Sequence, residues 1–108
     1  GFLSIPKGRI IVDAGAVKAL LHGGKSLLPA GVVAAEGDFH QGDVVEVAGP
    51  DGRTIGRGVT NYDAWQLTAV AGLGSEEAQK RVDTPRPEVI HRDEWVSTPI
   101  LKEAHSHE

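Results

Sequence analysis

The residues that most strongly suggest chemistry are Gly24-Lys25-Ser26, because the same three residue types end a phosphate-binding P-loop. A P-loop needs the pattern G-x-x-x-x-G-K-[ST] between a strand and a helix, so that backbone N–H groups and a helix N-terminus surround the phosphates. The position of the first glycine is occupied here by Ala19, and apolar residues with helical spacing precede the motif instead of following it. The sequence therefore does not predict a nucleotide site at this loop.

Other residues with catalytic potential also lack the companions that the chemistry needs. His91-Arg92-Asp93 resembles a protein-kinase catalytic loop, but Thr98 stands where that loop has an asparagine, so a strand edge with alternating charges is the better interpretation. The serines have no strand-to-helix turn of the G-x-S-x-G type. His105 and His107 have no further ligands at metal-binding spacing. We predict no catalytic residues and no metal site.

Composition predicts one small cytoplasmic domain. The 108 residues include no cysteine, which excludes a disulfide framework and thiolate zinc sites and is compatible with a reducing compartment. No apolar run approaches the roughly 18 residues of a membrane span, so we predict no membrane partner. Because the chain starts on Gly1-Phe2 without methionine, we expect an excised piece of a longer protein, with a naturally free-standing domain as the alternative.

The net charge counts against a dedicated nucleic-acid binder, although the distribution of the charges weakens this argument. The net charge is −4, from 11 basic and 15 acidic residues, whereas dedicated nucleic-acid binders usually carry a basic excess. Between residues 7 and 25, however, the sequence has four basic residues and only one acidic residue, Asp13. One end of the molecule is therefore expected to be locally positive.

Short strands and small helices are predicted along the chain. A β-branched run gives a strand over 9–12, and Asp13 caps a helix over 14–22 with Gly23 or Gly24 as its left-handed end. The inward face of this helix is expected to hold Ala16, Val17, Leu20 and Leu21. Further strands are predicted over 31–35, 43–47, 53–59 and 88–96, and further helices over 64–71, capped by Asp63 with Gln66, and from a cap at Ser75. This pattern indicates a mixed α/β, β-rich fold with a barrel-like sheet and helices at its ends.

The loop after the first helix is the best candidate for binding. Gly23 and Gly24 allow a phosphate backbone to approach the main chain, and Lys18 and Lys25 supply positive charge beside Ser26. The alternative is a glycine helix cap followed by a solvated turn.

Several segments in order resemble one family. They are GRIIVDAGAVKALLHGGKSLLPAGV, GDFHQGDVVEV, GRGVTNYDAWQLTAVAG and EVIHRDEWV, and together they resemble the C-terminal PUA domain of bacterial glutamate 5-kinases over Gly8 to Val96. The resemblance implies a PUA-like pseudo-barrel of short strands with small flanking helices. It places the PUA domain at residues 9–97, with 1–8 as a tail or remnant of excision and 98–108 as a flexible tail.

The resemblance also implies two functions. In such a kinase, an ATP-dependent phosphotransferase that acts on the glutamate side-chain carboxylate in proline biosynthesis, the ATP and Mg site lies in a separate amino-acid-kinase domain. This chain would then be a non-catalytic, cofactor-free accessory domain that contacts the kinase domain of the same polypeptide and could join a homo-oligomer through it. Alternatively, it binds structured RNA by shape and backbone, as PUA relatives do. The RNA-binding candidates are Lys18, Gly23, Gly24, Lys25, Ser26, Leu27, His91 and Arg92.

Overall fold

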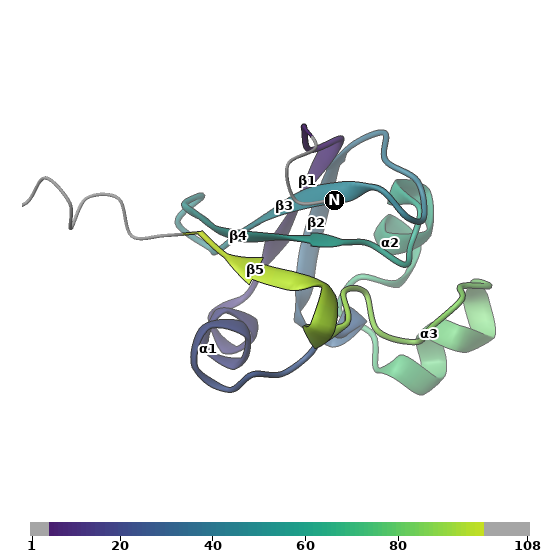
Figure 1. Ribbon diagram of the computed structural model, residues 1–108. Coiled ribbons are helices and arrows are strands. Elements are labelled where there is room, and N and C mark those ends of the chain that lie inside the picture. The colour runs from purple at the N-terminus through teal and green to yellow at the C-terminus, as the bar shows by residue number, and fades with distance from the viewer. Residues whose placement is uncertain (1–4, 99–108) are drawn as a thin grey trace, which may run out of the picture.

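The computed structural model describes residues 5–98 of the chain (Figure 1). Part of the predicted N-terminal tail, most of the predicted C-terminal tail, and His105 and His107 lie outside the described residues. The described part folds around a five-stranded sheet in the order β2-β1-β3-β4-β5, in which β1 and β3 are parallel and the other neighbours antiparallel. The prediction of a mixed, β-rich fold is confirmed.

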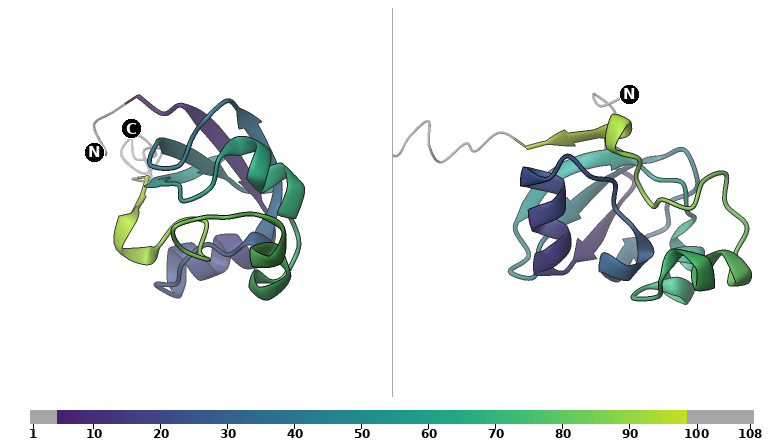
Figure 2. Two further views of the ribbon diagram at one scale, coloured as in Figure 1. Left: turned by 90° about the vertical axis from the view of Figure 1, so that its right-hand side faces the viewer. Right: turned by 90° about the horizontal axis from the view of Figure 1, so that it is seen from below.

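The elements follow the predicted order. The strands are β1 (Gly8–Val12), β2 (Val32–Gly37), β3 (Val44–Ala48), β4 (Thr54–Val59) and β5 (Trp95–Ser97). The helices are α1 (Ala14–His22), α2 (Ala64–Val70) and α3 (Ser75–Arg81), with short 3₁₀ turns η1 (Pro29–Gly31) and η2 (Arg92–Glu94). Figure 2 shows that α1 and α2 lie at different ends of the sheet.

The sheet separates core from surface by strand alternation. Ile10 and Val12 of β1 and Val45 and Val47 of β3 are buried on the inner face. On the other face, register places the charged residues Glu36, Arg9, Glu46 and Arg57 in one row across four strands, with alternating sign. Opposite charges on neighbouring strands stabilise a sheet, so this row supports the same register that fills the core.

Local capping signals predicted the helix ends well. The Asp13 carboxylate accepts a hydrogen bond of 2.8 Å from the amide of Ala16, as expected for the cap of α1. Gln66 completes the predicted capping box of α2, because its side chain accepts from the amide of Asp63 at 2.8 Å. The cap of α3 is Gly74, so the prediction of Ser75 was wrong by one residue.

Two predictions that depended on tertiary packing were wrong. Leu21 is 38% exposed, because only one narrow stripe of the short helix α1 meets the core and Leu20 fills it. The strand predicted over 88–96 is divided: Ile90 forms an isolated bridge with Leu27, η2 then turns the chain, and β5 pairs with β4. The segment changes its pairing partner, which no alternation pattern can reveal.

The repeated glycines of β4 make room for the returning chain. A Cβ added at Gly56 would lie 2.5 Å from the ring of Trp95, and one at Gly58 would lie 2.5 Å from Ile90. The chain therefore approaches the backbone of β4 too closely for a side chain at either position. It allows the segment from Ile90 to β5 to pack directly on the sheet.

Candidate functional site

A pocket of about 320 Å³ lies between α1 and the loop that follows it. Its lining residues are Ala16, Ala19, Lys25, Ser26, Leu27, Leu28, Ala30, Gly31 and Glu88. The volume is at the lower end of the roughly 300–1,000 Å³ of small-molecule sites, and small aliphatic side chains make up most of the wall. The pocket lining thus includes three of the predicted RNA-binding residues, Lys25, Ser26 and Leu27.

Backbone pairing joins the glycine loop to the last part of the described chain. Leu27 donates its N–H to the carbonyl of Ile90 at 2.9 Å and accepts from the amide of Val89 at 2.8 Å. One residue away, the Ser26 hydroxyl oxygen accepts from the amide of Arg92 at 2.9 Å, across 66 positions of sequence. The structure therefore brings Ser26 and Leu27 together with His91 and Arg92.

The glycines at the end of α1 shape the turn into the pocket. Of the two glycines predicted as the left-handed end of α1, Gly24 has φ of +60° and takes that conformation, whereas Gly23 stays right-handed. The amides of Gly23 and Lys25 both donate to the carbonyl of Ala19, at 3.0 and 3.3 Å. No atom lies within 4 Å of a Cβ built on Gly24, so the backbone requires the glycine while the space beside it stays open.

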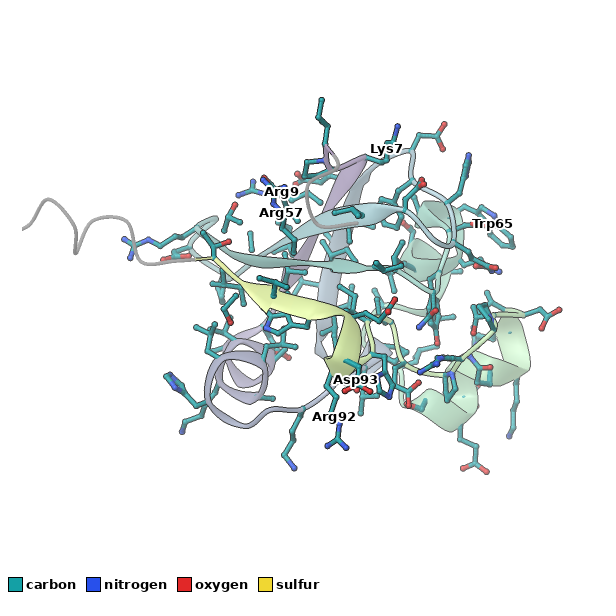
Figure 3. All side chains as sticks on the ribbon, viewed as in Figure 1. Lys7, Arg9, Arg57, Trp65, Arg92 and Asp93 are labelled. Carbon is teal, nitrogen blue, oxygen red and sulfur yellow. The ribbon has the colours of Figure 1, made fainter. Side chains whose placement is uncertain are left out.

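Three exposed basic residues lie on the segments that meet near this loop: one on α1, one in the loop itself and one in η2. Lys18, Lys25 and Arg92 are all exposed, and none of the three forms an ion pair with a residue of the described part of the chain. Figure 3 shows the Arg92 side chain pointing away from the fold below η2. Glu88 supplies a carboxylate on the pocket wall. The side chains at the rim of the pocket are therefore positively charged, whereas the pocket lining carries charges of both signs. Lys18 is on α1 and does not line the pocket.

The His91 side chain caps the short turn η2. Its Nδ1 accepts from the amide of Asp93 at 3.1 Å and lies 3.6 Å from the Asp93 carboxylate. In the neutral ring this hydrogen bond places the proton on Nε2. The Ser26 hydroxyl and the His91 ring thus each accept a hydrogen bond from a backbone amide of η2, and together they fix its path.

A polar clamp positions the segment that forms the far wall of the pocket. The Tyr62 hydroxyl donates to the carbonyl of Pro87 at 2.7 Å and receives a hydrogen bond from Gln79 at 3.0 Å. Asn61 donates through its side chain to the carbonyl of Glu88 at 3.1 Å and through its backbone to Val89 at 2.8 Å. Sequence reasoning did not assign these roles, and the buried tyrosine beside an asparagine was the only local signal.

Two acidic residues outside the site stabilise turns by accepting hydrogen bonds from nearby backbone amides. Asp43 accepts from the amide of His40 at 2.8 Å, and Asp51 accepts from that of Arg53 at 2.9 Å, consistent with the glycine-rich sequence around them. Across residues 5–98, no group of three or more histidines and carboxylates could hold a metal ion. Nor is any helix in this range long and apolar enough to cross a membrane.

Comparison with known families identifies the fold. The model of the PUA domain matches residues 8–82. The chain belongs to the PUA domain family. This PUA domain is also similar in structure to a crystallised PUA domain from Aeropyrum pernix K1 in complex with tartrate, at 27% identity and a TM-score of 0.59, over 92% of this chain and 48% of that one.

Two of its sequence relatives are glutamate 5-kinases. The PUA domain is 58% identical over 90 residues to glutamate 5-kinase of Geobacillus kaustophilus, which covers 83% of this chain and 24% of the relative. It is 50% identical over 97 residues to glutamate 5-kinase of Shouchella clausii, which covers 90% and 26%. The chain thus spans about a quarter of the length of these curated relatives. The family resemblance seen in the sequence is confirmed.

The clamp predicts a pH dependence of stability. Burial raises the pKa of Tyr62 above its ordinary value of 10, so the folded phenol keeps its proton at a pH where the unfolded chain loses it. The free energy of unfolding should therefore fall as pH rises from about 10 through the raised pKa. Tyr62→Phe should abolish this fall and, near neutral pH, cost about 1 kcal/mol because Pro87 and Gln79 lose a partner.

Urea unfolding as a function of pH measures both effects. Because Tyr62 is the single tyrosine of the chain, its ultraviolet absorbance reports the titration directly. A titration midpoint at or below 10 in the folded protein would contradict the burial argument.

Proposed function

We propose that this PUA domain is the non-catalytic accessory domain of a glutamate 5-kinase, joined in one polypeptide to an amino-acid-kinase domain. The observation that supports this most strongly is 58% identity confined to 24% of the relative's length. That share equals one small domain and leaves most of the relative's chain for the phosphotransfer site. The ATP and Mg of the reaction would bind there, and the whole protein would act in cytoplasmic proline biosynthesis.

The domain would act on the kinase through contact. The side chains of Ser26 and His91 hold backbone amides around η2, and no nucleophile is paired with a free base among the described residues of the pocket and its rim. A domain of this kind can alter turnover, inhibition by proline or assembly of the parent by stabilising one arrangement of it. Oligomerisation would then occur through the parent polypeptide.

Removing the domain from the parent tests this role. We expect deletion of the segment corresponding to residues 9–97 to change kcat/KM, proline sensitivity or oligomeric state, because the kinase domain loses a contact surface. Steady-state kinetics with and without proline, combined with sedimentation velocity, measures all three. If all three stay unchanged, the accessory role is wrong.

RNA binding is the second candidate, and the geometry of the glycine loop favours it. The Ser26–Arg92 hydrogen bond brings Arg92 beside the loop that carries Lys25, and both cations lack an ion-pair partner within residues 5–98. The left-handed Gly24 leaves space for a phosphate backbone. We infer that structured RNA would contact this rim through its phosphates, with recognition by shape. Lys18, Gly23 and His91 complete the proposed surface, whereas the predicted Leu27 is buried and would support the loop from beneath.

Comparing two lysine variants in a salt titration distinguishes binding at this loop from general electrostatic attraction. We expect Lys25→Ala to weaken binding of a labelled structured RNA and to reduce the slope of log affinity against log salt by about 1, because one phosphate contact is lost. Lys7→Ala makes the same charge change at the start of β1, away from the pocket, and should leave the slope unchanged. Fluorescence anisotropy at several salt concentrations measures both variants. Flat curves, or equal losses in both variants, would contradict an RNA site at the glycine loop.

A further inference from the structure

Trp65 is a large aromatic side chain that the fold leaves at the surface. It is 66% exposed, although its helix neighbours Gln66, Leu67 and Val70 are buried. Figure 3 shows it pointing outward from α2. The core of the domain does not require this indole, and tryptophan is among the residue types enriched at the energetic centres of protein interfaces.

Trp65 lies at the end of the sheet where the chain enters β1. Gly8 at the start of β1 pairs with Gly37 at the end of β2, and two residues later the carbonyl of Phe39 accepts from the amide of Ala64, one residue before Trp65. The amide of Gln41 also donates to the Asp63 cap of α2, at 2.9 Å. Any segment joined to the N-terminal side of β1 therefore enters close to the start of α2.

The pocket lies at the other end of the same strand. β1 leads directly into Asp13 and α1, and five residues of strand span roughly 17 Å. Figures 1 and 2 show α1 and α2 well separated across the sheet, and Figure 3 shows Arg92 and Trp65 on different sides of the molecule. A partner seated on Trp65 would therefore leave the glycine loop accessible.

The charges near Trp65 favour a protein partner over a phosphate backbone. Exposed Glu36 and Asp38 precede the segment that contacts α2, and Asp63 caps the helix itself. Lys7 is the cation at this end of β1. An exposed indole with a polar surround of this kind has the composition of a protein interface: an aromatic centre and a hydrophilic rim.

We propose that the kinase body of the same polypeptide packs against this end of the domain, with Trp65 inserted into an apolar cavity of the body. The inference rests on the proposed function, because that function supplies the partner. About three-quarters of the relatives' length lies outside the region matched here. A body attached at β1 is held at high effective concentration beside α2, so a modest apolar contact suffices to dock it.

Hydrogen exchange on the intact polypeptide tests the docking. We expect amides of residues 64–70 and 37–41 to exchange at least about tenfold more slowly in the intact polypeptide than in the 108-residue chain, with no difference at residues 24–31. Trp65→Ala in the intact polypeptide should remove the protection. The same substitution in the 108-residue chain should leave exchange unchanged, because the side chain is exposed there.

Val96→Ala is the matched control. Val96 is an apolar side chain on β5 that is 46% exposed, and its truncation should preserve the protection of α2. Equal exchange of residues 64–70 in the intact polypeptide and the 108-residue chain would overturn the proposal, as would protection at residues 24–31 instead. If deletion of the domain still alters the kinase in either case, the accessory function stands and only this docking surface is wrong.

Discussion

The pairing of Leu27 with Ile90 is the interaction on which the candidate site depends. Both side chains are almost fully buried, so the backbone hydrogen bonds between the two segments are shielded from water and correspondingly strong. Residues 82–91 contain no helix or multi-residue strand of their own. The bridge and the clamp from Asn61 and Tyr62 give this segment a fixed path, and that path places Glu88 on the pocket wall and Arg92 beside Ser26.

Short-range signals explain what the sequence could predict. Asp13, Gly24 and the Asp63–Gln66 box act within one turn of chain, so their effects can be deduced from neighbouring residues. The division of residues 88–96 could not be deduced, because the partners of that segment, Leu27 and β4, are chosen by three-dimensional packing. The same reasoning applies to the site. Lys25, Ser26 and Leu27 belong to one recognisable loop, whereas Glu88 reaches the pocket only through the fold.

Two candidate contact surfaces lie at opposite ends of the sheet. At one end of β1, Asp13 starts the helix whose glycine exit, with Lys25 and Arg92, forms a positive rim around a small pocket. At the other end, the entering chain lies close to the exposed Trp65. The similarity to glutamate 5-kinases is the basis for proposing a kinase body as the partner at the second end. Contact with a kinase body and contact with RNA would therefore use different surfaces and need not compete.

NMR-detected hydrogen exchange of individual amides in this chain tests the central claim that backbone pairing builds the site. The amides of Leu27 and Val89 should exchange as slowly as that of Val47 in the central strand β3, because all three are buried and bonded to backbone carbonyls. Exchange of Leu27 and Val89 at the rate of the exposed Gly24, with Val47 still protected, would contradict the account. The glycine loop and the segment carrying Arg92 would then be separate mobile elements, and no preformed site would exist between them.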